Sequence, residues 1–101
     1  MPDWIRIATS AECPPGSAAE FVAGGRVVAL FNVGGEFFAL DGVCPHQGGP
    51  IGKGNLDGCI VTCPWHGWQF DVRNGKNQVS PSVIQPQIPV RVEEDSVFIQ
   101  V

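Results

Sequence analysis

The chain has 101 residues, a formal net charge of −4 at pH 7 and a pI of about 4.9. A chain of this length supports one compact core, so residues 1–101 are expected to form a single domain without a separate substrate-binding domain. Phosphate binding requires clustered Lys and Arg, and the six basic residues against ten acidic ones argue against a nucleic-acid partner. The 13 Gly and 9 Pro predict many turns and short strands rather than long helices.

The N-terminal part of the chain predicts four short strands. Residues 4–7 alternate as a strand does, and residues 20–23 form a second apolar stretch that ends at a glycine pair. Residues 26–32 and 36–40 are apolar runs joined through Val33-Gly34-Gly35, which is a hairpin signal. These segments therefore predict antiparallel pairing early in the chain.

The C-terminal part continues the same pattern. Further strands are predicted at residues 59–62, 69–72, 90–92 and 97–101. A turn at Asn74-Gly75 follows the second of these strands, and an acidic, solvated turn around Glu94-Asp95 joins the last two. Strands this short at regular spacing favour an all-β fold, an antiparallel sandwich or barrel-like arrangement.

Two short motifs contain both histidines of the chain and two of its four cysteines. One residue separates Cys44 from His46, and two residues separate Cys63 from His66. A glycine-containing turn follows each motif, and each is expected at the tip of a hairpin. Thiolate and imidazole together suit zinc and iron-sulfur centres, so two loops are predicted to hold one inorganic centre.

The spacing of the ligand types separates these two candidates. A structural zinc finger usually takes a cysteine pair from one turn and a histidine pair from another, whereas each motif here mixes the two types. In one class of binuclear iron-sulfur centre, two histidines replace two cysteines on one of the irons. The mixed motifs follow naturally if each loop gives its cysteine to one iron and its histidine to the other. A zinc-stabilised interaction module remains the alternative.

The chain resembles Rieske [2Fe-2S] proteins, most closely the small Rieske-type ferredoxins of bacterial ring-hydroxylating oxygenase systems. The resemblance rests on Cys-x-His, sixteen further residues and Cys-x2-His, and it extends through residues 63–71 to Ser80-Pro81-Ser82. It implies an all-β Rieske fold with a small cluster-binding subdomain whose loops span about residues 42–70. It also implies one [2Fe-2S] cluster per chain. The implied ligands of this cluster are Cys44, His46, Cys63 and His66.

The resemblance further implies an electron carrier. Such a protein takes single electrons from a flavin-containing reductase and passes them to a terminal oxygenase that often acts on aromatic compounds. The chain shows no obvious nucleophile or acid-base pair, so it is not expected to be an enzyme by itself. The small Rieske-like subunit of an assimilatory nitrite reductase is a second hypothesis. A Rieske domain cut from an oxygenase subunit is disfavoured, because the chain begins at Met1 and ends on a predicted strand.

The sequence also predicts where the protein is located and what the two remaining cysteines do. No secretory signal and no stretch of about 20 apolar residues is visible, so a cytoplasmic protein without a membrane anchor is expected. Cys13 and Cys59 match no ligand position, and a disulfide between them is not expected in a reducing compartment. Cys59 is predicted to be a small buried hydrophobe on its strand, and Cys13 an unreactive thiol.

Two departures from the high-potential respiratory branch of the family bear on redox behaviour. In that branch a disulfide joins the position five residues after the first ligand cysteine to the position two after the second. Those positions are Gly49 and Trp65 here, so the disulfide cannot form. Two hydroxyl groups that donate to cluster sulfurs in that branch are replaced by Trp68 and Phe70. The resemblance therefore implies a low reduction potential.

The glycine-rich run at residues 48–53 superficially resembles a phosphate-binding loop. The glycine spacing is too short, however, and Gly54 stands where Ser or Thr should hold Mg²⁺. These glycines are better explained as turn residues that let the backbone pass close to the cluster.

Overall fold

The computed structural model describes residues 4–43, 49–65, 67–80 and 82–100. The elements in these ranges are β1 (Trp4–Thr9), η1 (Ser10–Glu12), β2 (Ala18–Ala23), β3 (Arg26–Val33), β4 (Glu36–Asp41), η2 (Ile51–Lys53), β5 (Asn55–Asp57), β6 (Ile60–Thr62), β7 (Gln69–Asp71), β8 (Gln87–Ile88), β9 (Val90–Glu93) and β10 (Ser96–Gln100). Both η elements are single turns of 3-10 helix. The all-β prediction is confirmed, and no helix in the described ranges is long and apolar enough to cross a membrane.

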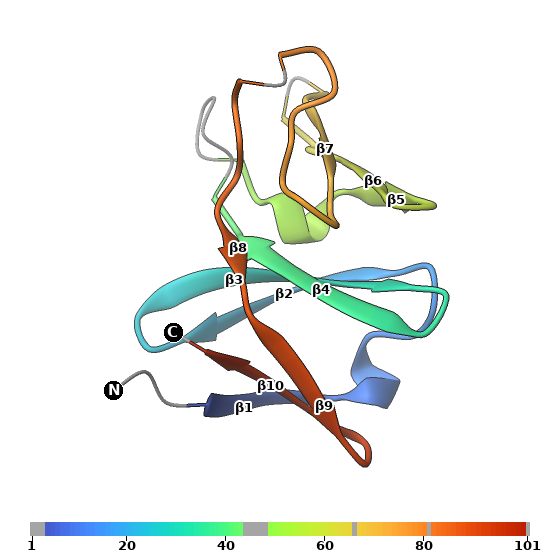
Figure 1. Cartoon of the computed structure of the whole chain (residues 1–101), viewed down its shortest axis with the longest axis vertical. Coiled ribbons are helices and arrows are strands. Elements are labelled where there is room, and N and C mark those ends of the chain that lie inside the picture. Colours follow the sequence, from blue (N-terminus) through green and yellow to red (C-terminus); the bar gives the residue numbers. More distant parts are fainter. Residues whose placement is uncertain (1–3, 44–48, 66, 81, 101) are drawn as a thin grey trace.

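The strands form three antiparallel sheets. The strand orders are β1-β10-β9, β2-β3-β4-β8 and β5-β6-β7. Figure 1 shows the first two sheets stacked on each other, with the third sheet on the far side of the four-stranded one. The four-stranded sheet is therefore the middle layer of the molecule.

The middle position of this sheet explains the apolar run in β3. Side chains alternate across a strand, so Val28 and Leu30 point to one face while Ala29 and Phe31 point to the other. All four are fully buried, because both faces of the sheet are covered. A strand covered on both faces has an almost continuous apolar sequence rather than an alternating one.

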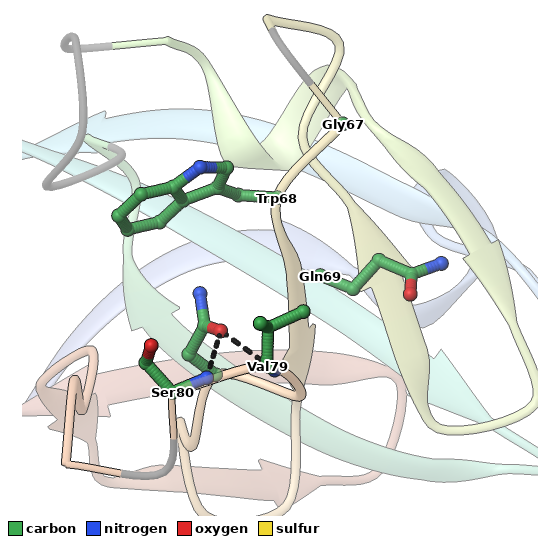
Figure 2. A pocket seen from close by; sticks show the side chains of 6 residues that line it. Gly67, Trp68, Gln69, Val79 and Ser80 are labelled. Atoms are coloured by element: carbon green, nitrogen blue, oxygen red, sulfur yellow. Dashed lines mark hydrogen bonds between the residues drawn. The ribbon is translucent and has the colours of Figure 1, made fainter.

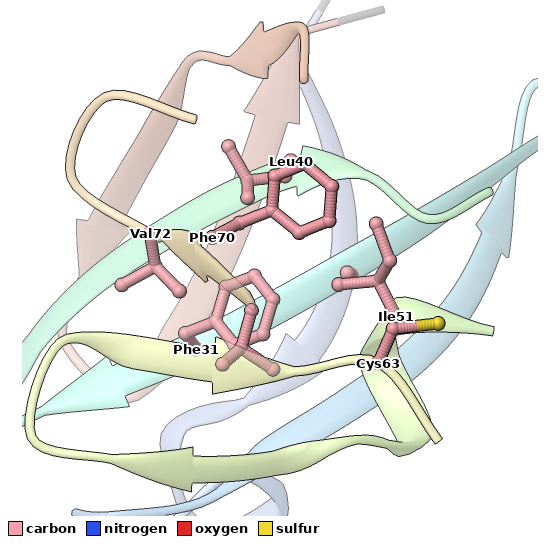
Figure 3. Packing of buried hydrophobic residues seen from close by; sticks show 8 residues of the cluster. Phe31, Leu40, Ile51, Cys63, Phe70 and Val72 are labelled. Atoms are coloured by element: carbon pink, nitrogen blue, oxygen red, sulfur yellow. The ribbon is translucent and has the colours of Figure 1, made fainter. Parts of the chain in front are cut away.

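Two hydrophobic cores follow from this layering. The base core lies between the two stacked sheets and comprises Cys13, Ala23, Val28, Leu30, Ala39, Ile88, Val97 and Ile99. The loop-side core lies between the middle sheet and the β5-β6-β7 sheet and comprises Ala29, Phe31, Leu40, Ile51, Val61, Cys63, Phe70 and Val72. Figure 3 shows part of the loop-side core, in which Phe31 and Leu40 meet Phe70 and Ile51.

The predicted hairpins are largely confirmed. Gly34 and Gly35 connect β3 to β4 with φ angles of +60° and +99°, as a two-residue loop between right-twisted strands requires. The Asn32 side chain accepts a hydrogen bond from the Gly35 N–H at 2.7 Å and so closes the loop. The exposed Glu94-Asp95 turn joins β9 to β10 at the end of the molecule remote from the β5-β6-β7 sheet (Figure 1).

Two strands were not predicted, and one predicted strand begins later. β5 has the sequence Asn-Leu-Asp and carries too little apolar pattern to be recognised. β8 lies between Pro86 and Pro89 and is a short edge strand paired only with β4, where flanking prolines are tolerated. β6 begins at Ile60, because Cys59 forms a two-residue loop with Gly58, whose φ is +60°.

Candidate metal centre

The first metal loop follows β4. Val43 and Pro50 form an isolated antiparallel bridge, and the Ile51 N–H donates to the Gly42 carbonyl at 3.1 Å. Among the described residues the loop is closed by this one bridge, and the helix η2 rather than a strand follows it, which corrects the expectation that it lies at a hairpin tip. Cys44 and His46 lie within it, outside the described residues.

The second metal loop joins β6 to β7, as predicted. Thr62 pairs with Gln69, and the Cys63 N–H donates to the Trp68 carbonyl at 2.7 Å. Gly67 has a φ of +73°, which an L side chain rarely adopts. This hairpin therefore places Cys63 where the loop begins, while His66 lies outside the described residues.

Cys63 is the proposed ligand whose surroundings the structure describes. Its side chain is only 1% exposed and belongs to the loop-side core, where it lies beside Ile51 (Figure 3). The strand β6 and the closing hydrogen bond fix its backbone, so its sulfur is held at the boundary between the core and the metal loops.

The two metal loops come into direct contact at Gly49. A Cβ at Gly49 would lie 2.8 Å from the Cys63 Sγ and 2.9 Å from the Trp65 Cβ. The first loop therefore passes against the thiol and the side chain of the second. This close contact between the two loops fits one inorganic centre held by both. The positions that the resemblance aligns with the respiratory disulfide, Gly49 and Trp65, are thus neighbours in space.

Two further glycines attach the first loop to the rest of the fold. A Cβ at Gly52 would lie 2.8 Å from the Ala19 carbonyl oxygen, and one at Gly54 would meet the Thr62 carbonyl oxygen. Both glycines therefore allow close approach to the backbone of neighbouring strands, whereas the sequence had predicted a close approach to the cluster. Gly52 lies within η2 and Gly54 directly follows it; this helix has three residues and offers no phosphate-binding N-terminus.

Trp68 packs between the second loop and a cavity of about 280 Å³. Its ring contacts Phe70 at a centroid distance of 6.4 Å and a tilt of 45°. On the other side of the cavity, Asn77 Oδ1 accepts hydrogen bonds from the backbone N–H groups of Val79 and Ser80, both at 2.9 Å (Figure 2). Trp68 therefore has a packing role, and Asn77 orders the backbone of Val79 and Ser80, directly before Pro81, which lies outside the described residues.

An ion pair joins Asp71, the last residue of β7, to Arg73. Arg73 donates from Nε to Asp71 Oδ1 at 3.0 Å and from Nη2 to Oδ2 at 2.7 Å. The backbone N–H of Arg73 adds a third hydrogen bond to Oδ1 at 2.9 Å. The hydrogen bonds from the Arg73 guanidinium lower the pKa of Asp71 below its ordinary value, although burial opposes this shift. The pair fixes the turn that leads from β7 toward Asn77.

Acid stability should depend on this pair. Since the pKa of Asp71 is lowered in the folded protein, its contribution is present above the unfolded pKa, about 3.9, and is lost as pH falls through the folded value. We expect Asp71→Asn to lower the free energy of unfolding at neutral pH by about 1 kcal/mol, because Arg73 is largely exposed and the pair is partly screened. Chemical denaturation at several pH values measures this.

The matched control is Asp57→Asn, which removes the same charge from an exposed position on β5. The difference in stability between Asp71→Asn and wild type should shrink below pH 4, roughly the unfolded pKa. An equal loss in both variants, or a loss independent of pH, would contradict the role assigned to the pair.

The remaining two cysteines, Cys13 and Cys59, are free thiols. Cys13 is fully buried in the base core, and burial raises the pKa of its thiol, which supports the prediction that it is unreactive. Cys59 lies in the β5-β6 turn, is only partly buried and packs against the loop-side core. The prediction that Cys59 is a buried strand residue is therefore wrong.

Comparison with known proteins agrees with this geometry. Residues 3–92 match the Rieske [2Fe-2S] domain family, so the chain belongs to that family. Its cofactor is accordingly a Rieske-type [2Fe-2S] cluster. The contact between the two loops at Gly49 and the buried thiol of Cys63 fit such a group.

Three relatives illustrate the similarity. The biphenyl dioxygenase ferredoxin subunit of Pseudomonas sp. (strain KKS102) is 40% identical over 91 residues, covering 87% of this chain and 83% of the relative. A chain of the complex of reduced oxygenase and oxidized ferredoxin in carbazole 1,9a-dioxygenase has a TM-score of 0.86 and 29% identity, covering 96% of this chain and 92% of that one. The putative NADH-dependent nitrite reductase small subunit from Mycobacterium tuberculosis has a TM-score of 0.89, 24% identity and coverage of 100% and 96%, which shows a shared fold.

Proposed function

We propose that this protein is a one-electron carrier, a Rieske-type ferredoxin that passes electrons to a terminal ring-hydroxylating oxygenase. The similarity over most of both chains to a dioxygenase ferredoxin subunit carries this proposal. The complex of an oxygenase with a ferredoxin supports the same partner class. A flavoprotein reductase as electron donor, a cytoplasmic location and the absence of catalysis by the chain alone belong to the same proposal.

The proposed ligands are Cys44 and His46 from the first loop and Cys63 and His66 from the second. In a Rieske centre two cysteines bind one iron and two histidines bind the other, which accounts for the mixed motifs. We place them in a single domain of residues 1–101, with the cluster-binding loops at about residues 42–70. The burial of Cys63 and its contact with the first loop support this assignment.

When bound, the cluster supplies reversible one-electron chemistry. The chain contributes a dry and fixed environment on the side of the cluster that faces the protein. The loop-side core excludes water around Cys63, and the hydrogen bond from its N–H to Trp68 fixes the loop backbone. Trp68, in the second loop, packs against Phe70, on β7, and extends this environment.

Two exposed apolar side chains lie close to the second loop and suit a brief protein contact. Trp65 is 49% exposed, and Val79, which lines the cavity beside Gly67, is 89% exposed. Electron-transfer partners meet through small interfaces, and exposed apolar groups with polar surroundings are typical of such surfaces. The acidic β9-β10 turn lies at the opposite end of the molecule, which argues against a docking role for it (Figure 1).

The function is tested by mixing the reduced protein with candidate acceptors under anaerobic conditions. We expect rapid reoxidation by the terminal oxygenase of a biphenyl dioxygenase system and slow reoxidation by the catalytic subunit of a nitrite reductase. Val79→Lys should slow transfer to the oxygenase about tenfold, because it places a charge in the contact. The control Val22→Lys alters an equally apolar, 71% exposed side chain on β2. Transfer to the nitrite reductase alone would overturn the proposal.

A further inference from the structure

Gly49 is required for space rather than for backbone conformation. Its φ lies outside the left-handed region that favours glycine, unlike Gly67 in the second loop, whose φ is +73° and whose Cβ would meet nothing within 4 Å. A Cβ at Gly49 would instead lie under 3.0 Å from atoms of two residues of the second loop. The first loop can therefore lie against the second only because Gly49 has no side chain.

The atoms that crowd this position cannot move away easily. They are the Sγ of Cys63 at 2.8 Å and the Cβ and Cγ of Trp65, both at 2.9 Å. The Trp65 Cβ is fixed by the backbone, while the Trp65 Cγ and the Cys63 Sγ are each one rotatable bond further out and occupy discrete staggered positions. Any larger residue at Gly49 would push the loops apart.

Trp65 is the exposed member of this contact. It is half exposed, so part of its ring meets water while the root of its side chain lies on Gly49, which is buried. Cys63, whose Sγ approaches the same Cβ position of Gly49, is only 1% exposed. The contact at Gly49 therefore joins a half-exposed side chain to the buried thiol of the proposed ligand.

We propose that Gly49 and Trp65 form a noncovalent latch between the two metal loops. The latch sets the separation of the loops and limits the access of water to the Cys63 sulfur. It thus takes the place of a covalent link between the loops. The inference rests on the proposed function, in which both loops hold one [2Fe-2S] cluster. Trp65 and Gly49 act on the cluster through the loops and are positioning residues.

Opening the latch should affect cluster retention and redox behaviour together. Solvent exposure is one of the factors that set the potential of an iron-sulfur centre, and local opening is what lets a chelator reach the metal. Loss of a merely structural contact would lower thermal stability without changing the potential. The two readouts therefore separate the latch from general packing.

The test uses the cluster-containing protein and measures the reduction potential and the rate of bleaching by an iron chelator. Trp65→Gly removes the Cβ and Cγ that meet Gly49, and should bleach about tenfold faster, equivalent to about 1.4 kcal/mol of loop opening, with a shifted potential. Trp65→Phe keeps both atoms and an apolar ring, and should behave as wild type. Gly49→Ala should resemble Trp65→Gly.

The double variant Gly49→Ala/Trp65→Gly isolates the contact. Gly49→Ala should have a smaller effect in the Trp65→Gly background, because two of the three crowding atoms are then gone. The matched control is Gly52→Ala, whose Cβ would meet the Ala19 carbonyl oxygen, away from the latch. Its effect should add to that of Trp65→Gly.

Two results would overturn the latch while leaving the electron-carrier function in place. One is a bleaching rate and potential in Trp65→Gly equal to those of wild type. The other is an effect of Gly49→Ala that is the same in both backgrounds. If Trp65→Gly does not fold, Trp65→Ala, which removes the Cγ and the ring but keeps the Cβ, is compared with Trp65→Phe instead. A wild-type protein that takes up no cluster would instead contradict the proposed function and, with it, the latch.

Discussion

Cys63→Ala is expected to abolish the [2Fe-2S] cluster while leaving most of the β fold in place. Cys63, the proposed ligand that the structure describes, belongs to the loop-side core and not to the base core, so the two stacked sheets should keep their packing when the metal loops lose their centre. Cys44→Ala, His46→Ala and His66→Ala are expected to do the same. Iron content and the visible spectrum measure the loss, and far-UV circular dichroism measures the remaining strand content.

The other two cysteines provide matched controls. Cys59→Ala, on the β5-β6 turn, should leave the visible spectrum unchanged. Cys13→Ala should also keep the spectrum, but it should lower the free energy of unfolding by about 1 kcal/mol because the thiol is fully buried in the base core. Loss of the cluster in Cys59→Ala with the fold intact would show that the thiolate ligands are assigned wrongly.

The reduction potential is expected near the low end of the Rieske range, about −150 mV. The high-potential branch stabilises its reduced state with two hydroxyl donors, and Phe70 has no donor at all. Phe70 is fully buried in the same core as Cys63, so water cannot supply the missing hydrogen bond at this position. Voltammetry on the wild-type protein measures the value, and a potential well above zero would contradict this account.

Phe70→Tyr tests the missing hydroxyl directly. A new hydrogen bond that favours the reduced state by about 1 kcal/mol would raise the one-electron potential by about 40 mV. The control is Phe31→Tyr, which adds a hydroxyl to an equally buried ring of the same core but from the middle sheet. An equal shift in both variants would mean that the hydroxyl acts through core packing rather than through the cluster.

The local patterns of the sequence predicted much of the fold. The apolar run of β3 and the Gly34-Gly35 turn specified a hairpin because side-chain burial and turn conformation agree there. β5 and β8 could not be predicted, because short polar or proline-flanked strands are held by their partners and not by their own sequence. Which of Cys13 and Cys59 is fully buried also depends on the layering, which no local pattern contains.

The candidate metal centre, like the fold, could be predicted only in part. The spacing of the two motifs indicated a shared centre, and the start of the second loop at Cys63 follows the predicted hairpin. The contact of Gly49 with Trp65 depends on how the first loop lies across the second, and sequence distance says nothing about it. Only the alignment to the respiratory disulfide hinted that these positions are neighbours.

Metal and sulfide analysis of the purified protein, combined with electron paramagnetic resonance of the reduced form, tests the central claim most directly. A Rieske centre predicts a coloured protein with two irons and two acid-labile sulfides per chain and a rhombic signal on reduction. A colourless protein that holds one zinc ion per chain, even after anaerobic expression and cluster reconstitution, would contradict the account.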